Sequence, residues 1–245
     1  MTELLTSEPP VNQSVERAVR LLAFFTPDEP EMTLAQITSR LGASRATTHR
    51  YAMALRRVGM LRYDAAVGTY TLGPRVVELA AAALAGLRIV KIAGPTMERL
   101  LAKVNETVVL SVFDGESPVV VRVEDNTDRL VRIVVRTGSR LPPTTSAQGK
   151  VFCTFGGDDT PNGLDAPEAA AILRTRLATN SDLVEGIRAI ATPVFQEEQL
   201  VAAMALVGTS ASIPEDVNSA GALQLIEAAS SLSAELGSLR TGRMV

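Results

Sequence analysis

The residues best suited to chemistry lie in a basic stretch of the chain between Arg40 and Arg75. Seven arginines in this stretch are accompanied by one acid, Asp64, although the whole chain has a net charge of −3. A local positive patch on an acidic protein indicates a polyanionic partner. The alternative is a solvated helix face with scattered arginines. The arginines are Arg40, Arg45, Arg50, Arg56, Arg57, Arg62 and Arg75.

Two short helices joined by a tight turn are expected to position this charge. Thr33 and Gln36 have the spacing of a capping box, and Gly42 is placed to end the first helix. Ser44 is predicted to cap the second helix, which Gly59 terminates. This pattern is typical of a helix-turn-helix unit.

The second helix of such a unit lies in the major groove, with its N-terminal residues facing the base edges. Arginine can bond guanine with two hydrogen bonds, and serine and threonine can reach bases or phosphates. The predicted DNA contacts on this helix are Ser44, Arg45, Thr47, Thr48 and Arg50.

A β-hairpin is predicted after the second helix, from strand-like runs at 60–63 and 69–72 that flank the turn 64–68. The hairpin would form a wing beside the DNA backbone, where contacts fix position rather than sequence. A plain three-helix bundle carrying a hairpin is the structural alternative. The predicted wing contacts are Arg62, Tyr63, Thr69 and Tyr70.

Few other residues suggest chemistry. His49 is the single histidine and Cys153 the single cysteine, and neither has partners at metal-ligand or catalytic spacing. The chain also lacks a phosphate-binding glycine loop and a nucleophile elbow. We therefore expect no enzyme activity, no cofactor and no metal. Cys153 is interpreted as a buried small apolar residue.

The cysteine content and the hydropathy pattern predict the cellular setting. A single cysteine permits no disulfide within the chain, which fits the reducing cytoplasm. No apolar run reaches the roughly 18 residues that a membrane span requires. Residues 1–12 have no signal or transit pattern and are expected to form a flexible leader.

The remaining chain is predicted to form two domains and a connection. A winged helix-turn-helix domain is expected over 13–73, with Ser14 opening an apolar helix that includes Val15 and Val19. Pro74 suits the first turn of a linker helix over 74–87, whose apolar surface would pack against a partner chain. The domain over 88–245 would follow this linker.

The pattern of the C-terminal domain predicts an α+β fold with a largely antiparallel sheet. Runs rich in β-branched and other apolar residues indicate strands, and amphipathic runs indicate helices. The predicted strands span 108–113, 119–123, 131–135, 187–195 and 200–207, and the predicted helices span 88–104, 146–155, 167–177 and 218–239.

A ligand site is suggested where the Pro142–Pro143 loop leads into the helix that begins near Ser146. A helix N-terminus presents free N–H groups and the positive end of the helix dipole, so it can bind a carboxylate. The alternative is that Thr145 or Ser146 is simply an N-cap.

From about residue 12 to 239 the chain resembles the IclR family of bacterial transcription regulators. The resemblance rests on the order and spacing of several short motifs rather than on any one of them. They are Gln13–Ala18, Leu34–Ile37, Thr47–Arg50, Tyr70–Arg75, Leu141–Pro142, Ser146–Lys150, Gly186–Phe195 and the strand before Gly208.

The resemblance implies a GAF-like effector-binding domain, binding to DNA as a dimer, and often a dimer of dimers. Family members commonly repress a nearby operon, and their effectors are commonly small organic or aromatic acids. Carried over residue by residue, the resemblance places the ligand against Leu130, Ile133, Ser146, Ala147, Gln148, Ile187, Ala189, Ala205 and Val207.

Two departures from the family pattern affect the expected ligand. Ala189, Ala205 and Val207 stand where the family often has polar residues or cysteine. An acidic residue that the family often has before Gly186 is replaced near Thr179 to Ser181. Both departures favour a bulkier, partly apolar effector, such as an aromatic acid or a derivative.

The sequence therefore predicts a local repressor that binds a pseudo-palindromic operator in double-stranded DNA as a homodimer or dimer of dimers, under control of a small-molecule effector. One alternative is a DNA-binding regulator whose C-terminal domain serves assembly and binds no small molecule. A catalytic C-terminal domain would require paired carboxylates, a partnered base or metal ligands, and none is visible.

Overall fold

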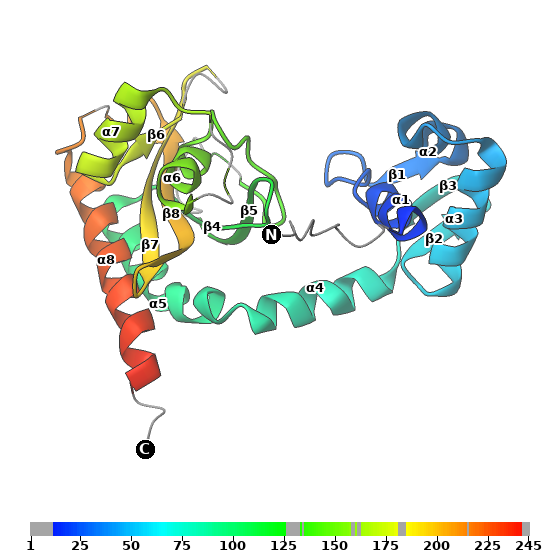
Figure 1. Cartoon of the computed structure of the whole chain (residues 1–245), viewed down its shortest axis with the longest axis horizontal. Coiled ribbons are helices and arrows are strands. Elements are labelled where there is room, and N and C mark those ends of the chain that lie inside the picture. Colours follow the sequence, from blue (N-terminus) through cyan, green and yellow to red (C-terminus); the bar gives the residue numbers. More distant parts are fainter. Residues whose placement is uncertain are drawn as a thin grey trace, which may run out of the picture. The chain divides into compact units, whose positions relative to one another are not determined.

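The computed structural model describes residues 12–125, 133, 135–157, 160, 163–180, 185–214 and 216–241. The chain divides into two compact units, Met1–Ala83 and Leu84–Val245. The boundary falls within helix α4 (Pro74–Gly86), which Figure 1 shows as a continuous helix. In the described part, no helix is both long enough and apolar enough to cross a membrane.

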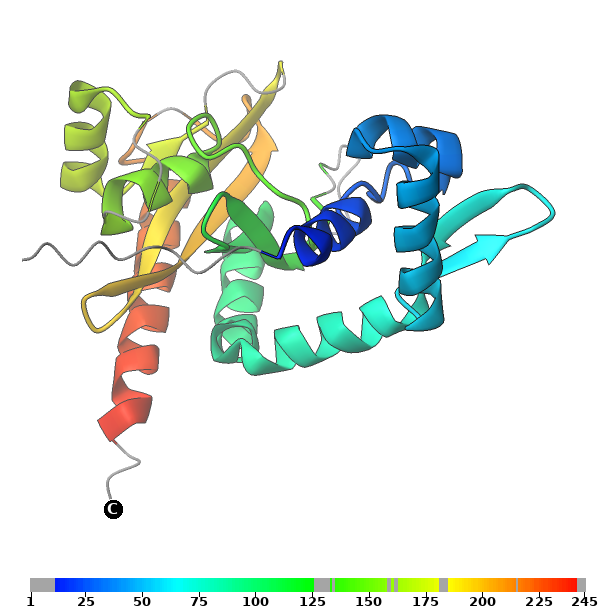
Figure 2. The same ribbon diagram turned by 45° about the vertical axis from the view of Figure 1, so that its right-hand side comes forward.

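The first unit packs three helices against a small antiparallel sheet of order β1-β3-β2. The predicted hairpin is confirmed, and Figure 2 shows it extending beyond the helices of this unit. Strand β1, which pairs with β3, was not anticipated. The elements are α1 (Gln13–Leu22), β1 (Glu31–Thr33), α2 (Leu34–Leu41), α3 (Arg45–Arg57), β2 (Leu61–Asp64) and β3 (Thr69–Leu72).

Local capping explains the helix-turn-helix geometry. The Gln36 amide accepts a hydrogen bond from Thr33 N at 2.8 Å, and Thr33 Oγ1 accepts one from Gln36 N at 3.3 Å, as a capping box requires. Gly42 ends α2 in the left-handed conformation, with φ of 65°. Ser44 then caps α3 through a bond from Thr47 N.

Helices α1 and α4 leave apolar side chains exposed. Helix α1 begins at Gln13 with Asn12 as its N-cap, not at Ser14 as predicted. Val15 and Val19 of its predicted apolar stripe are exposed, whereas Leu21, which was not part of that stripe, is buried. Helix α4 begins with Pro74, as predicted, and has no buried residue.

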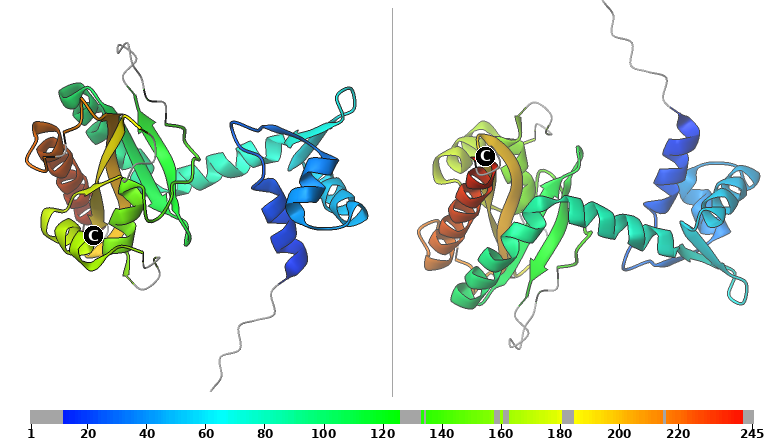
Figure 3. Two further views of the ribbon diagram at one scale, coloured as in Figure 1. Left: turned by 90° about the horizontal axis from the view of Figure 1, so that it is seen from above. Right: turned by 90° about the horizontal axis from the view of Figure 1, so that it is seen from below.

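The second unit contains a five-stranded antiparallel sheet of order β5-β4-β8-β7-β6. Helices α5 and α8 cover one face and α6 and α7 the other, and the views in Figure 3 show α5 beside α8. The elements are α5 (Arg88–Val104), β4 (Thr107–Phe113), β5 (Pro118–Glu124), α6 (Ala147–Phe155), α7 (Ala166–Thr175), β6 (Ala178–Thr179), β7 (Ile187–Gln196), β8 (Gln199–Thr209) and α8 (Ala220–Thr241).

The observed elements confirm the α+β class and most of the predicted ranges. Strand β6 was not anticipated, because only two residues pair with β7. The strand predicted over 131–135 lies partly outside the described residues, and the described Ile133 and Val135 are not in a strand.

Candidate functional site

Helix α3 has one buried stripe and one broad exposed face. Thr48, Ala52 and Leu55 point into the core of the first unit. This stripe turns the opposite side of the helix to solvent, so that Arg45 and Arg50 are exposed near its N-terminus.

The arginines of the basic stretch divide into neutralised and uncompensated groups. Arg40 is paired with Glu29 at 2.6 Å, and Arg75 with Glu78 at 2.7 Å. Five others form no ion pair with any described residue, so the positive potential is concentrated on α3 and β2. They are Arg45, Arg50, Arg56, Arg57 and Arg62.

The hydroxyl groups at the start of α3 have structural roles. The Ser44 hydroxyl caps the helix and donates to Thr47 Oγ1 at 2.9 Å, while both side chains keep access to solvent. Thr48 is fully buried and donates to the Ser44 carbonyl oxygen at 3.1 Å. Of the predicted contacts on α3, Thr48 is therefore the one that packs inward in this structure.

The wing carries exposed side chains that could contact a partner and buried side chains that support its own fold. Arg62 and Tyr63 are exposed, and the Arg56 guanidinium carbon lies 5.3 Å from the Tyr63 ring centroid. Thr69 is half-buried, and its hydroxyl donates to Glu31 at 3.4 Å. Tyr70 is only 4% exposed, and burial raises the pKa of its phenol. Tyr70 therefore supports the wing from inside.

Several exposed residues of α3 were not among the predicted contacts. His49, Met53 and Arg57 are exposed on the helix that carries Arg45 and Arg50. A helical-wheel reading of the buried stripe could have found them, because positions opposite that stripe must face solvent.

The predicted ligand residues meet in one layer between α6 and the sheet. Ala147, Ala189, Ala205 and Val207 belong to a single apolar cluster, against which Ile133 and Ile187 pack. Val207 lies opposite Ala189 in the β7–β8 ladder. Leu130 lies outside the described residues. The layer is therefore walled chiefly by small apolar side chains.

Polar groups gather at the N-terminus of α6. The Ser146 hydroxyl accepts from Gly149 N at 3.0 Å and donates to the Pro142 carbonyl oxygen at 2.5 Å, so it acts as an N-cap. Gln148 is 3% exposed, and its side-chain amide bonds to no described residue. The backbone N–H groups of Ala147 and Gln148 likewise have no described acceptor. Buried donors of this kind suit an acceptor-rich ligand.

Asn180 is a further polar residue of this layer, which the sequence pattern did not single out. Its side-chain oxygen accepts from Ala189 N at 2.6 Å, and its amide nitrogen donates to the Ile187 carbonyl oxygen at 3.3 Å. Asn180 thus fixes the end of β7 that carries two predicted ligand residues.

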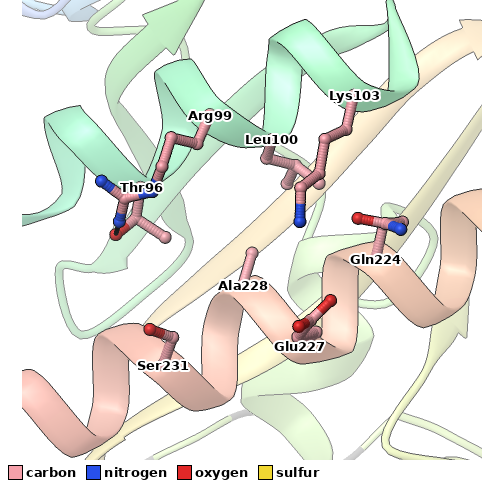
Figure 4. A pocket seen from close by; sticks show the side chains of 8 residues that line it. All are labelled: Thr96, Arg99, Leu100, Lys103, Gln224, Glu227, Ala228 and Ser231. Carbon is pink, nitrogen blue, oxygen red and sulfur yellow. Dashed lines mark hydrogen bonds between the residues drawn. The ribbon is translucent and has the colours of Figure 1, made fainter.

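A polar groove between α5 and α8 is too small to form a comparable site. Figure 4 shows a groove of about 150 Å³ between α5 and α8, where Lys103 points toward Gln224 and Glu227. Its volume is below the roughly 300–1,000 Å³ of typical ligand pockets. Among the described residues, no three His, Cys, Asp or Glu side chains are grouped to hold a metal ion.

Comparisons with known proteins identify both units. The model of the IclR helix-turn-helix domain matches residues 14–65, and that of the bacterial transcriptional regulator IclR C-terminal domain matches 81–164. The HTH-type transcriptional regulator XynR of Escherichia coli is 30% identical over 93% of this chain and 98% of that protein. The DNA-binding transcriptional repressor YiaJ of E. coli is 26% identical over 94% and 89%.

A solved structure has the same fold. An IclR homolog from Microbacterium hydrocarbonoxydans, crystallised with 4-hydroxybenzoate, aligns with a TM-score of 0.74. The alignment covers 92% of this chain and 99% of that one at 24% sequence identity.

Proposed function

Because the chain belongs to the IclR family of bacterial transcriptional regulators, whose members are not enzymes, we propose that it is a local repressor controlled by a small organic acid. The observation that carries this proposal is the uncompensated positive charge of Arg45, Arg50 and Arg62 on an exposed helix face and wing. DNA phosphates and guanine edges match this charge and these donors.

In the proposed complex, α3 lies in the major groove and the hairpin lies beside the backbone. Arg45 and Arg50 read base edges, and Ser44 and Thr47 contact bases or phosphates. Arg62, Tyr63 and Thr69 form the wing contacts. Thr48 and Tyr70 act indirectly, because their burial holds α3 and the wing in shape.

The proposed effector binds in the layer between α6 and the sheet. Its carboxylate accepts from the free N–H groups of Ala147 and Gln148, and its apolar part contacts Ala189, Ala205 and Val207. Ser146, Ile133, Leu130 and Ile187 complete the proposed contacts. The 4-hydroxybenzoate bound by the homolog from M. hydrocarbonoxydans supports an aromatic acid.

The proposed repressor is a cytoplasmic homodimer, or a dimer of dimers, on a pseudo-palindromic operator. The exposed apolar side chains of α1 and α4 support self-association, since contiguous apolar surface marks protein interfaces. An effector that prefers one arrangement of the dimer would change DNA affinity by shifting populations.

The DNA-binding proposal is tested by titrating the full chain against its own promoter region and against unrelated DNA. Arg45→Ala should cost about 1–3 kcal/mol of specific binding and much less of non-specific binding, because a base contact carries sequence information. Arg174→Ala, an exposed charge change on α7, is the matched control and should change neither. Equal losses on both DNAs would reduce Arg45 to a phosphate contact.

Ligand control is tested separately by thermal-shift screening of organic acids, followed by DNA titration. A ligand selective for the native state must raise its stability, and Gln148→Leu should reduce that gain. If no acid stabilises the protein while specific DNA binding persists, the C-terminal domain serves assembly alone. The apolar character of Ala189, Ala205 and Val207 makes this the competing proposal.

A further inference from the structure

A second hollow lies at the point where α4 meets α5. Its lining residues Phe113, Phe152 and Leu200 also pack in the apolar cluster of the layer between α6 and the sheet, whereas Leu87 and Arg88 do not. It has a volume of about 440 Å³, within the roughly 300–1,000 Å³ range of small-molecule sites. We call it the junction cavity and define it by the lining residues Leu87, Arg88, Phe113, Phe152, Gln199 and Leu200. Of the nine residues predicted from the family resemblance, the eight that the structure describes do not line it.

The walls of the junction cavity are apolar and partly aromatic. Phe113 of β4 and Phe152 of α6 stack with their ring centroids 5.3 Å apart and their planes at 30°. Leu87 and Leu200 are half-buried and line the same space. Flat rings pack well against aromatic and aliphatic walls of this kind.

Among the described residues that line the junction cavity, the only charged side chain is that of Arg88. Arg88 is exposed and forms no hydrogen bond or ion pair with a described residue. Its described lining includes no aspartate or glutamate, and Gln196 and Gln199 contribute neutral amides. A guanidinium without a partner beside apolar walls is suited to a carboxylate, which it can bind through two parallel hydrogen bonds.

Another hollow of the same unit has the opposite character. A space of about 340 Å³ near the start of α8 is lined by Glu106, which is 7% exposed, as well as by Lys103. Burying an anion beside a buried carboxylate is unfavourable. Charge therefore distinguishes the junction cavity as the one of these two that suits an acid.

We propose that the junction cavity binds a monocyclic aromatic carboxylate, with its ring between the apolar walls and its carboxylate on Arg88. This site is additional to the effector layer beneath α6. The ligand would touch Gly86 and Leu87, where α4 ends and α5 begins without a side-chain cap. Its binding energy would therefore act directly on the helical connection to the DNA-binding unit.

The test uses the full chain and benzoate, with benzamide as the uncharged analogue, in calorimetric titrations. Arg88→Gln should weaken benzoate binding at least about tenfold, because a charge-assisted pair is lost. Lys91→Gln removes the same charge from an exposed position on α5 outside the cavity, and it should leave the affinity unchanged. Equal affinity in wild type and Arg88→Gln, or for benzamide and benzoate, overturns the proposal.

A site-resolved measurement separates this proposal from the proposed function. Intermolecular NOEs from benzoate ring protons should reach the methyl groups of Leu87 and Leu200, and should persist in Gln148→Leu. NOEs confined to Ile133 and Ile187 would place benzoate in the effector layer, which overturns the second site and supports the first. If Arg88→Gln changes self-association instead of benzoate affinity, the cavity is an interface between copies of the chain and the proposal fails.

Discussion

Individual side chains in the second unit differ in how well their polar atoms are satisfied. Ser111 is fully buried in β4, opposite Ala203 of β8, and its hydroxyl has no hydrogen-bond partner in the described structure. Val109 and Phe113 on either side pack in the α6-facing cluster, so Ser111 points into that layer too. An unsatisfied buried hydroxyl costs free energy of folding.

Ser111→Ala should therefore raise the free energy of unfolding by about 1 kcal/mol, since the desolvated hydroxyl is removed. The matched control is Ser233→Ala. The Ser233 hydroxyl accepts from Phe195 N at 3.0 Å and donates to the Ala229 carbonyl oxygen at 2.7 Å, so its loss should lower stability by a similar amount. Urea unfolding followed by circular dichroism compares the two, and equal destabilisation would show that Ser111 is satisfied in solution.

Tyr70 makes the free energy of unfolding depend on pH under alkaline conditions. Burial raises its pKa in the folded protein, so the folded state holds the phenolic proton more tightly than the unfolded chain. The associated stability is complete below the unfolded pKa of about 10 and falls as the pH rises through the folded value. Urea midpoints measured across this range should fall less steeply for Tyr70→Phe. An unchanged slope would contradict the raised pKa.

At the scale of elements, a close approach of two backbone segments fixes the base of the wing. A side-chain carbon added at Gly73 would lie 2.1 Å from the Gly59 carbonyl oxygen. Gly73 N also donates to the Met60 carbonyl oxygen at 2.8 Å, and Arg75 N donates to that of Gly59 at 3.2 Å. The wing and the start of α4 are thus locked to the end of α3 through Gly73.

Gly73→Ala should destabilise the DNA-binding unit by about 1–3 kcal/mol, because the clash involves backbone that has no other place to go. Gly42→Ala is the control, since it meets no atom within 4 Å and incurs only the cost of its φ of 65°. Tyrosine fluorescence reports on this unit selectively, because Tyr51, Tyr63 and Tyr70 all lie in it and the chain has no tryptophan. A smaller destabilisation by Gly73→Ala than by Gly42→Ala would contradict the close backbone approach at Gly73.

At the scale of the whole molecule, self-association is expected to depend on α4. Val77 is 71% exposed and Leu79 is 48% exposed, which is unfavourable for a helix that remains in water. If this surface is the dimer interface, one buried charge there should weaken the dimer strongly.

Val77→Glu should shift the protein toward monomer in sedimentation velocity experiments and weaken binding to a two-half-site operator. Binding of two recognition helices is linked through the dimer, so the operator affinity should fall even though α3 is unchanged. Glu78→Asp is the neighbouring control, because it keeps the charge on the same helix. An unchanged sedimentation profile for Val77→Glu would move the interface elsewhere.

The local signals in this sequence were sufficient for the helix-turn-helix and most of the sheet. Thr33, Gly42 and Ser44 act on backbone groups a few residues away, so their caps could be identified without tertiary information. The alternating pattern of the strands and the helical pattern of the helices in the second unit are likewise set by residues that are close in the sequence. The clustering of arginine in an acidic chain was likewise visible in the sequence.

The tertiary structure decided which of the predicted contact residues are exposed at the surface and which arginines are unpaired. Glu29, 11 positions before Arg40 in the chain, neutralises that arginine, and burial withdraws Thr48 and Tyr70 from the surface. Such outcomes depend on contacts between distant segments, which periodicity and spacing do not encode. The short strands β1 and β6 depend in the same way on partners elsewhere in the chain. The sequence thus determined the charged helix and its type, whereas tertiary contacts, both ion pairs and packing, decided which arginines stay exposed and unpaired among the described residues.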